Sequence, residues 1–592
     1  MKTISVEHLC RVEGNGGISA TIDGKKVTEV KFNIYEGPRL IEQLTIGRTP
    51  EEDVSLAPRI CAICTLSHKN AVLRAIEKAL SVKVPKKTIL MRELMHMGEI
   101  IESHSLHIFL LALPDYLGYP NAIAMAAKYD LEVKIGLEMK NFGNHIMKTI
   151  SGRYIHGENP VIGGFGKFPD KKDLLWIKSR AQQFMPFVLK TVSLFCELDY
   201  PEIPEDETLY ACCDPGNGKF GFWGEKILLS NGESIPADDY KKLTNEFVVS
   251  HSYAKHSLYK GKPYSVGALA RINNLGERLD GEAGRKFKKY FNEHWKKNPL
   301  YHNAAQALEI LYCFERIPVL VKKILKDENT PKIIPYSVKE GKGTGLVEAP
   351  RGLLIHHYEI KNGLVSNVDI ITPTAQNAED IERYCYIATQ KLLDEGQEEK
   401  IRDRMDLVVR AFDPCISCSA HSAQVRQGKT DEWKSKLETI LTHEEPAFLG
   451  IGNFRQGDDA VGIFIGKQLR DAGQKNVWLE SSTNEMESFW KSNAGKPVIF
   501  LDAIDFQEKP GTVTFLPLLY ALNNSSLVHK FSPFVTGPLK YNQLKKSYIL
   551  GIQPASLKRG KTISPCVKKA TREVLETLKS RQKKNRHFKD KE

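Results

Sequence analysis

Residues 59–68 read RICAICTLSH and residues 413–421 read DPCISCSAH, so the chain carries two Cys-x-x-Cys pairs that are far apart in sequence. Four thiolates brought together by a fold make a soft, anionic site suited to nickel, iron or zinc. A structural zinc clamp usually draws its halves from nearby segments, because it staples a small fold that lacks a core. A thioredoxin-like redox pair needs one such motif, whereas this chain has two. The separation therefore favours a metal at the centre of a large domain.

The composition predicts a soluble enzyme with more than one domain. At 592 residues the chain exceeds what one hydrophobic core usually serves, and its hydrophobic content of 41% and charged content of 26% are ordinary for globular proteins. No apolar run reaches the roughly 18 residues that a membrane span needs. Eleven cysteines are a low density, and no signal peptide is visible. Both features predict a reducing, cytoplasmic location.

Nucleic-acid binding is not predicted, although the net charge is +12. Much of this charge lies in residues 579–592, where seven Lys/Arg stand against two acids. Aromatic and basic residues do not interleave anywhere in the chain, and a basic tail alone is usually a solvated, disordered segment.

The pattern of apolar residues divides the chain into four parts. Residues 1–421 predict a largely helical α+β unit, with antiparallel strands near 18–22 and 27–34 and a helix over 88–113 that Pro114 ends. Further helices are expected at 131–151, 171–198 and 378–393. Residues 422–445 are a polar connector with a short helix at 431–441, residues 446–579 a three-layer α/β domain, and residues 580–592 a basic tail. The α/β domain is expected to contain strands at 447–451, 497–501 and 548–552 and helices at 459–469 and 566–578.

With their flanking residues, the cysteine pairs read RxCxxCxxxH and DPCxxCxxH, and over residues 1–421 the chain resembles the large subunit of [NiFe] hydrogenases. The resemblance implies reversible heterolytic oxidation of H₂ to protons and electrons at a Ni-Fe(CO)(CN)₂ centre. It also implies that Cys61 and Cys415 are terminal nickel ligands and that Cys64 and Cys418 bridge nickel to iron. The remaining iron ligands would be carbon monoxide and two cyanides.

Three further motifs match the same family and imply roles close to the metals. Residues 11–14, RVEG, resemble the family's RxEG, where Glu13 would take a proton from Cys415; an isolated Glu-Gly would more often be a surface turn. Thr374, in the segment Thr-Pro-Thr, would donate a hydrogen bond to a cyanide. His68 would form a hydrogen bond near a bridging sulfur, a role close to that of any satisfied buried histidine.

Residues 349–352, APRG, resemble another family motif that places an arginine at the open coordination position. There Arg351 would polarise bound hydrogen or act as a base, and Asp413 would fix its orientation as an ion-pair partner. A purely structural Arg–Asp pair is compatible with the same residues.

Residues 39–42, RLIE, resemble the family's RGxE, in which Glu42 and the histidine after the second pair, His421, coordinate a structural Mg²⁺ or another divalent ion. Ala62 departs from the glycine that many members have. The sequence at Ala62 and Ile63, together with residues 91–94 and 266–271, is similar to that of the soluble cytoplasmic branch, which couples hydrogen to nicotinamide, deazaflavin F420 or sulfur reduction.

The resemblance also implies partner proteins. No cysteines remain in iron–sulfur spacing, so electrons would leave through a separate iron–sulfur small subunit. Flavin and nicotinamide (diaphorase-like) or other electron-transfer subunits would lie beyond it. Nickel-insertion maturation factors are implied as well. The competing hypothesis is an unprocessed or regulatory homologue without catalysis.

The segment after residue 446 is similar to the hydrogenase maturation endopeptidases, on the stretches LGIGN (449–453), GDDAVG (457–462), LDAID (501–505) and LGIQP (550–554). The similarity implies Asp459 and Asp502 as nickel ligands. The family's third ligand, a histidine in a Ser-Pro-His segment, is replaced where the chain reads Ser532-Pro533-Phe534-Val535, and His529 is out of register, so a degenerate protease is expected. A dinucleotide-binding fold is a weaker alternative, because the third glycine comes too late for GxGxxG.

Overall fold

The computed structural model describes residues 2–37, 40–204, 206–216, 218–420, 432–453, 457–479, 483–504, 510–518, 546–556 and 562–589. The chain divides into two compact units, Met1–Ser422 and Ala423–Glu592. Each unit has its own apolar core, and the core of the first is by far the larger. No helix in the described ranges is both long enough and apolar enough to cross a membrane.

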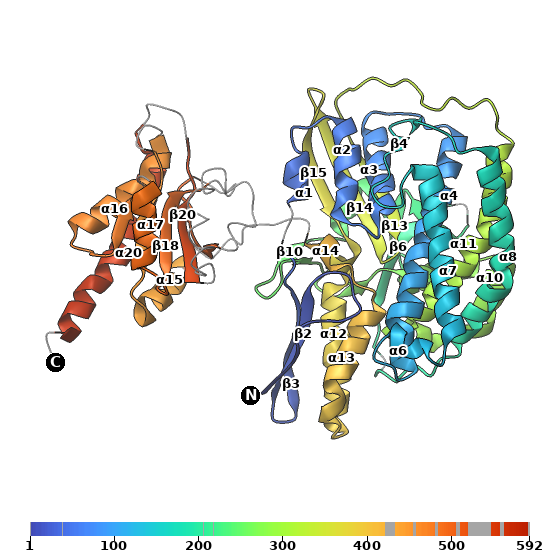
Figure 1. The fold of residues 1–592 in the computed structure, drawn as a ribbon, viewed down its shortest axis with the longest axis horizontal. Helices are drawn as coiled ribbons and strands as arrows, with labels where there is room; N and C mark the ends of the chain where they lie inside the picture. The colour runs from blue at the N-terminus through green and yellow to red at the C-terminus, as the bar shows by residue number, and fades with distance from the viewer. Residues whose placement is uncertain are drawn as a thin grey trace. The chain divides into compact units, whose positions relative to one another are not determined.

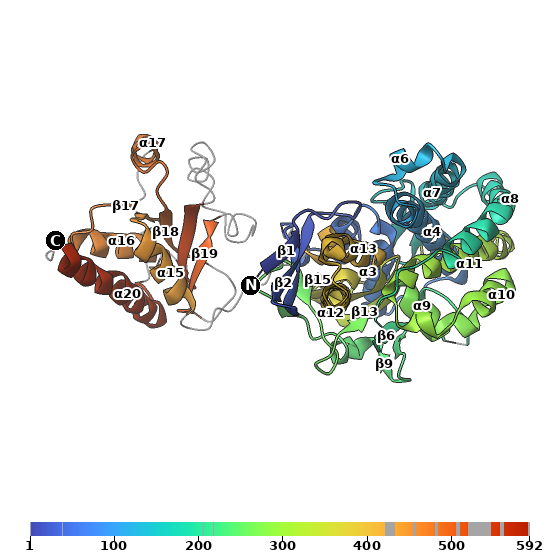
Figure 2. The ribbon, with the colours of Figure 1, turned by 90° about the horizontal axis from the view of Figure 1, so that it is seen from below.

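Four long helices form the helical half of the first unit, and they lie side by side in both views (Figures 1 and 2). They are α4 (Lys86–Ser105), α7 (Asp130–Ser151), α8 (Lys171–Cys196) and α11 (His302–Leu325). Gly98 and Gly143 let α4 and α7 approach, since a Cβ on Gly143 would lie 2.5 Å from the carbonyl oxygen of Gly98. The expected helices at 131–151 and 171–198 are confirmed.

The helix expected over 88–113 does not end at Pro114. A π-helical segment, Leu106–Ala112, follows α4, and α5 (Leu113–Tyr116) carries Pro114 in its first turn. Proline has no N–H to donate, and the first turn of a helix needs none. The wider π turn therefore lets the chain continue in helical form past the proline.

A four-stranded antiparallel sheet covers the other half, in the order β15-β14-β13-β7. Its strands are β7 (Trp223–Gly224), β13 (Gly341–Ala349), β14 (Gly352–Lys361) and β15 (Leu364–Ile371). Helix α3 (Thr65–Ala79) packs directly on β13. Side chains at Gly341, Gly343 and Gly345 would collide with it, because their Cβ atoms would lie 2.2, 2.3 and 2.4 Å from carbonyl oxygens of α3.

The predicted N-terminal strands are confirmed as β2 (Gly16–Asp23) and β3 (Lys26–Ile34), which pair antiparallel beside β1 (Lys2–Val6). Helix α12 (Pro373–Asp394), which confirms the helix expected at 378–393, packs on β3 and on α13 (Ile401–Ala411), as Figure 2 shows end-on. The other helices of this unit are α1 (Ile41–Thr45), α2 (Pro50–Leu56), α6 (Ala122–Ala126), α9 (Ala268–Leu275), α10 (Gly281–Tyr290) and α14 (Ile416–Ser419). Its other strands are β4 (Pro160–Val161), β5 (Gly164–Phe165), β6 (Leu209–Asp214), β8 (Lys226–Leu229), β9 (Ser234–Pro236), β10 (Phe247–Val248), β11 (Lys255–His256) and β12 (Tyr264–Ser265).

The second unit is built on a five-stranded sheet in the order β17-β16-β18-β20-β19. Its strands are β16 (Ala447–Gly450), β17 (Val477–Leu479), β18 (Val498–Ala503), β19 (Val513–Pro517) and β20 (Ser547–Ile552), all parallel except the edge strand β19. Its helices are α15 (Glu432–His443), α16 (Val461–Asp471), α17 (Thr483–Ser492) and α20 (Pro565–Lys589).

Helices of this unit lie on both faces of its sheet. Ile499 and Leu501 of β18 share an apolar cluster with α15, α16 and α20. Phe500 alternates to the opposite face, where it contacts Trp490 of α17. The segment expected to be a disordered tail differs from the prediction, because α20 continues through residue 589.

Candidate metal centre

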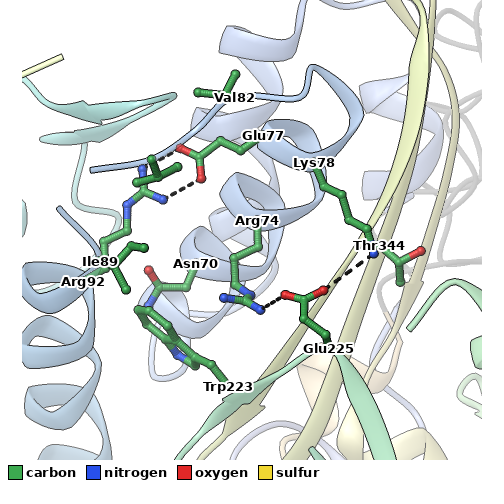
Figure 3. Close-up of a pocket in the computed structure, with 11 residues that line it drawn as sticks. Asn70, Arg74, Glu77, Lys78, Val82, Ile89, Arg92, Trp223, Glu225 and Thr344 are labelled. Atoms are coloured by element: carbon green, nitrogen blue, oxygen red, sulfur yellow. Dashed lines mark hydrogen bonds and ion pairs between the residues drawn. The ribbon is translucent and has the colours of Figure 1, made fainter. Parts of the chain in front are cut away.

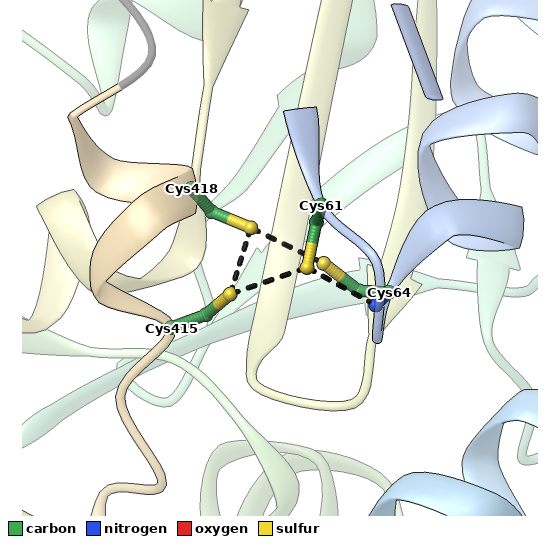
Figure 4. A group of neighbouring side chains, drawn as sticks. All are labelled: Cys61, Cys64, Cys415 and Cys418. Carbon is green, nitrogen blue, oxygen red and sulfur yellow. Dashed lines mark hydrogen bonds between the residues drawn. The ribbon is translucent and has the colours of Figure 1, made fainter. Parts of the chain in front are cut away.

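Four cysteine sulfurs meet in the interior of the first unit (Figure 4). All four lie within 4.8 Å of one another, and each residue is at most 4% exposed. The sulfur of Cys61 lies 3.4 Å from that of Cys415, the sulfur of Cys64 lies 3.3 Å from that of Cys418, and the pair Cys415–Cys418 is 2.8 Å apart. The structure therefore brings together the two pairs that the sequence separates.

The N-terminal ends of two helices position these sulfurs. Cys64 immediately precedes α3, and Cys415 immediately precedes α14. The first turn of α3 is held by a buried carboxylate from α4, because Glu99 accepts the backbone N–H groups of Leu66 and Ser67 at 2.6 and 2.8 Å. Burial raises the pKa of Glu99 to about 8. The first cysteine pair is thus fixed by a helix start and not by a flexible loop.

The thiols are electrostatically unequal. Burial alone would raise the pKa of Cys61, but hydrogen bonds from the other three thiols and the charge of Arg351 outweigh it and hold that pKa well below its ordinary value. The pKa of Cys64 is raised to about 11, and burial raises the pKa values of Cys415 and Cys418 further. Four soft sulfur donors, enclosed by apolar neighbours, fit a thiolate-binding transition metal.

Glu13 reaches the centre from the N-terminal segment. Its Oε2 accepts hydrogen bonds from the sulfur of Cys415 at 3.2 Å and from the backbone N–H of Ser417 at 3.0 Å. Its carbonyl oxygen accepts from the N–H of Ile416 at 3.0 Å. Gly14 has φ +88°, and a Cβ there would lie 2.8 Å from Cβ of Ile416. The glycine of the RVEG motif is therefore required for this close approach.

Arg351 reaches the centre from the turn between β13 and β14. Its guanidinium donates to the carbonyl oxygen and Oδ1 of Asp413, at 3.0 and 2.9 Å, and to the hydroxyl of Ser103 at 3.0 Å. Gln306 donates to the other oxygen of Asp413 at 3.2 Å. Burial would lower the pKa of Arg351, but Asp413 and the cysteines raise it well above its ordinary value. The arginine is therefore charged, buried and held in one orientation.

Thr374 and His68 also lie in the shell around the cysteines. The hydroxyl oxygen of Thr374 accepts the backbone N–H of Cys415 at 2.9 Å, which leaves the hydroxyl proton to donate elsewhere. His68, in the first turn of α3, lies with its Nδ1 2.9 Å from Nε2 of His356 on β14. Both residues are buried.

Glu42 lies in α1, and its Oε1 accepts the backbone N–H of Ile370 at 2.7 Å. It is 9% exposed. His421, the second residue expected at the magnesium site, falls outside the described residues. Leu40, which stands where the family's RGxE has glycine, has φ 54°, a conformation that glycine adopts most easily.

In the second unit, Asp459 and Asp502 are both buried, at 3% and 4% exposure. The backbone of Gly452 packs against the backbone of Asp459, since a Cβ on Gly452 would lie 1.8 Å from the carbonyl oxygen of Asp459. Within the described ranges neither aspartate belongs to a group of three potential metal-binding side chains. The segments with His529 and with residues 532–535 lie outside the described residues.

A pocket of about 310 Å³ lies between α3, α4, β7 and β13 (Figure 3). Its wall carries ion pairs from Arg74 and Lys78 to Glu225, at 2.6 and 3.6 Å, and from Arg92 to Glu77 at 2.7 Å. None of the residues predicted for the metal centre lines it.

Some residues around the cysteines were not predicted from the sequence. Three of them lie on long helices and act on the centre indirectly. Ser103 contacts Arg351, Gln306 contacts Asp413, and Glu99 contacts the first turn of α3. Only tertiary contacts reveal them, because each looks like an ordinary polar residue in a helical pattern. Ser417 could have been suspected, since it lies between the two cysteines of the second pair.

Comparison with known proteins places this geometry in a family. A profile of the nickel-dependent hydrogenases matches residues 39–156 and 231–421. The chain belongs to this nickel-dependent hydrogenase family and is a hydrogenase large subunit, an oxidoreductase.

Individual relatives agree. The chain is 42% identical to the alpha subunit of sulfhydrogenase 2 of Pyrococcus furiosus, over 71% of this chain and 98% of that one. It is 30% identical to a subunit of the vhu F420-non-reducing hydrogenase of Methanocaldococcus jannaschii, over 66% and 99%. A solved NAD⁺-reducing [NiFe]-hydrogenase superposes with a TM-score of 0.65 at 26% identity, over 71% of this chain and all of that one.

Proposed function

We propose that Cys61, Cys64, Cys415 and Cys418 hold the nickel–iron centre of a working hydrogenase that interconverts H₂ with two protons and two electrons. The observation that carries this proposal is the group of four buried sulfurs with Glu13 and Arg351 reaching it from different segments. When bound, the metals and their carbon monoxide and cyanide ligands supply redox and Lewis-acid chemistry for splitting H₂. By resemblance, Cys61 and Cys415 would hold nickel, and Cys64 and Cys418 would hold nickel together with iron.

The proton is moved by residues of this chain. The sulfur of Cys415 passes it to Oε2 of Glu13 across 3.2 Å, a separation suited to direct transfer. The N–H of Ser417 stabilises the carboxylate when it is charged, so Glu13 is held in place in both protonation states.

Arg351 keeps a fixed positive charge next to the sulfurs and orients or polarises H₂, and Asp413 prevents the guanidinium from turning away. The oxygen of Thr374 accepts the backbone N–H of Cys415, and its hydroxyl proton would be available to donate to a cyanide ligand of the bound centre. His68, held by His356 at the start of α3, would support the cysteine sulfurs when the metals are bound.

Glu42 and His421 hold a structural Mg²⁺ or similar divalent ion. The support from the structure is that the Glu42 carboxylate is buried and fixed by the Ile370 N–H. A carboxylate oxygen is the kind of donor that such an ion prefers.

Electrons leave through a small iron–sulfur subunit, then through further flavin-, nicotinamide- or other electron-transfer subunits. The names of the relatives support a multi-subunit enzyme, since each describes one subunit of a larger hydrogenase: the alpha subunit of a sulfhydrogenase, a subunit of an F420-non-reducing hydrogenase and the beta subunit of the NAD-reducing hydrogenase HoxS. Nickel-insertion factors would assemble the centre. The cysteine usage of the sequence supports a cytoplasmic location.

The second unit is proposed to be a maturation-endopeptidase-like domain with a rearranged or lost metal site. Support comes from its glycine-rich turn against Asp459 and from the position of Asp502 near the end of β18. With only two carboxylates, nickel would bind weakly.

The deciding experiment is nickel and iron analysis of the purified protein, combined with infrared spectroscopy and H₂ uptake. One nickel and one iron per chain, with carbon monoxide and cyanide bands and H₂-dependent dye reduction, are expected. A chain that folds and binds its partners without these bands or activity would be the non-catalytic, regulatory homologue.

A further inference from the structure

A second group of potential metal ligands lies in the first unit and shares no residue with the cysteine centre. It contains His251, His256 and Glu382, and one donor atom from each lies within 4.8 Å of the others. His256 is on β11, Glu382 is on α12, and His251 lies in the segment before β11. The fold therefore brings two imidazoles and a carboxylate to one point from segments far apart in sequence.

The hydrogen bonds around His256 fix which ring nitrogen is available. Its Nδ1 lies 2.7 Å from Oε1 of Glu379, one turn before Glu382 on α12. An ionised carboxylate only accepts, so Nδ1 carries the proton and Nε2 presents its lone pair. His256 is fully buried, and its Nε2 has no hydrogen-bond partner within the described residues. A histidine whose far nitrogen donates to a carboxylate while its near nitrogen is unpaired has the arrangement of a metal ligand.

The other two side chains complete the arrangement. Nε2 of His251 lies 2.7 Å from Oε1 of Glu382, which also accepts the backbone N–H of Phe32 at 2.7 Å. An ion that binds here takes the place of the Nε2 proton of His251 in this hydrogen bond. The two imidazole rings are 5.4 Å apart at 87°, so they approach one point without stacking. The side chains of His251 and Glu382 are 16% and 15% exposed, which gives an ion a route from solvent.

We propose that His251, His256 and Glu382 form a second metal site for a divalent transition ion, with zinc as the occupant and Glu379 as the residue that orients His256. Two imidazoles and one carboxylate suit zinc, whereas magnesium prefers oxygen donors. Three protein ligands leave a fourth position for water. Because its ligands come from β11 and α12, the ion ties the segment before β11 to the helix whose first turn carries Thr374.

The test uses nickel-replete protein, so that zinc has no access to the cysteine centre. After incubation with Zn²⁺ and removal of the excess, we expect one zinc per chain in addition to nickel and iron. X-ray absorption at the zinc edge should show nitrogen and oxygen neighbours at about 2.0–2.1 Å and no sulfur at about 2.3 Å. Zinc with sulfur neighbours, or no retained zinc, would overturn the proposal and show that the histidines form only hydrogen-bonded pairs with Glu379 and Glu382.

Variants assign the ligands. His251→Asn and Glu382→Gln change partly exposed side chains, and each should lose most of the zinc while keeping nickel and iron, which reports correct folding. Glu379→Gln should weaken zinc affinity about 10- to 100-fold without changing the nitrogen and oxygen shell, because it replaces the charged acceptor of the His256 Nδ1–H with a neutral amide oxygen. His294→Asn alters an exposed histidine elsewhere and should retain full zinc.

Retention of full zinc by both His251→Asn and Glu382→Gln would exclude this site. The proposal stands apart from the hydrogenase centre, because nickel and iron are measured in the same samples. Loss of those metals would point to the cysteines, and loss of zinc alone to the histidines.

Discussion

Cys415 is the residue on which the most contacts of the centre converge. Its sulfur lies next to those of Cys61 and Cys418 and donates to Glu13, while its backbone N–H is held by Thr374. The large apolar core of the first unit includes none of the four clustered cysteines. They belong to a smaller apolar cluster of the same unit, so a change at this sulfur should affect the metals more than the large core.

Cys415→Ser tests this separation. The hydroxyl is a poor ligand for a soft metal, so nickel content and H₂ turnover should be lost while the thermal unfolding of the metal-free protein stays close to that of the metal-free parent. Metal analysis, H₂ uptake and circular dichroism measure the three quantities. Cys10→Ser, at an exposed cysteine, is the control. Outright unfolding, or full activity, would contradict a bimetallic centre held by a self-sufficient core.

Arg351→Lys should leave nickel bound but reduce turnover on the order of 100-fold, since a small misplacement of a catalytic group costs about that much. Lysine keeps the charge but cannot reproduce the planar fork that now contacts Ser103 and both the carbonyl and carboxylate oxygens of Asp413. Nickel analysis and H₂ uptake decide the outcome. Arg278→Lys changes a partly exposed ion pair elsewhere and should leave both unchanged. Normal uptake in the Arg351 variant would remove this residue from the mechanism.

Glu13→Gln should retain nickel but slow the exchange of D₂ with solvent protons by about 10²–10⁴-fold, the usual contribution of a positioned acid–base group. The amide oxygen still accepts from Ser417, so the local fold is kept, but the side chain no longer accepts a proton from Cys415. Isotope exchange followed by mass spectrometry measures the effect. Glu29→Gln replaces an exposed acid and serves as the control. Unchanged exchange would show that the proton leaves by another route.

At the residue scale the sequence predicted the cysteine centre well, because each motif carries several unusual residues at fixed spacing. Glu13 and Arg351 were predicted from their motifs, and the structure places both beside the sulfurs. The roles of Glu99 and Gln306 were not predicted. A helical pattern does not show that Glu99 faces the first turn of α3 or that Gln306 faces the carboxylate of Asp413. Their positions depend on packing between helices that are far apart in sequence.

At the element scale the approach of α3 to β13 sets the position of the first cysteine pair. Three alternate glycines of β13 face the carbonyl groups of α3, so the helix lies on the strand without intervening side chains. The sequence did not predict this contact, because alternating glycines favour neither strand nor helix until a partner is known. The π-helical turn before Pro114 was missed for a similar reason, as tertiary packing keeps the chain helical where the local sequence predicts an end.

Gly343→Ala tests that contact. The added Cβ would lie 2.3 Å from the carbonyl oxygen of Ala75, and backbone atoms must move to accept it. We expect a loss of about 1–3 kcal/mol in the free energy of unfolding, typical of overpacking, together with reduced nickel content because α3 shifts. Denaturant unfolding and metal analysis measure both. Gly221→Ala is the matched control, as its Cβ would meet only a side-chain carbon at 3.4 Å. Equal stability of the two variants would show that α3 can move away from β13 at little energetic cost.

At the scale of the whole molecule, the second unit follows the last cysteine motif closely in the sequence. The family match ends at residue 421, and the second compact unit begins at Ala423. The strands and helices of this unit lie close to the positions that the sequence indicated, since buried parallel strands are short apolar runs between turn residues. Whether residue 421 is the C-terminus of the mature protein depends on cleavage after it. No local sequence pattern shows whether that cleavage occurs.

We predict that the chain persists largely uncut after His421. On the proposed similarity of the second unit to the maturation endopeptidases, Phe534 or Val535 would stand where those enzymes have their histidine ligand. Two carboxylates, Asp459 and Asp502, bind nickel weakly without an imidazole. Intact mass spectrometry of nickel-replete protein should therefore show one dominant species at 66.8 kDa, the mass of the full chain. A dominant species ending at His421 would mean that cleavage occurs. If Asp459→Ala then blocked it, the second unit would be the protease and His529 the first candidate for its missing ligand; if cleavage continued, a separate endopeptidase would be responsible.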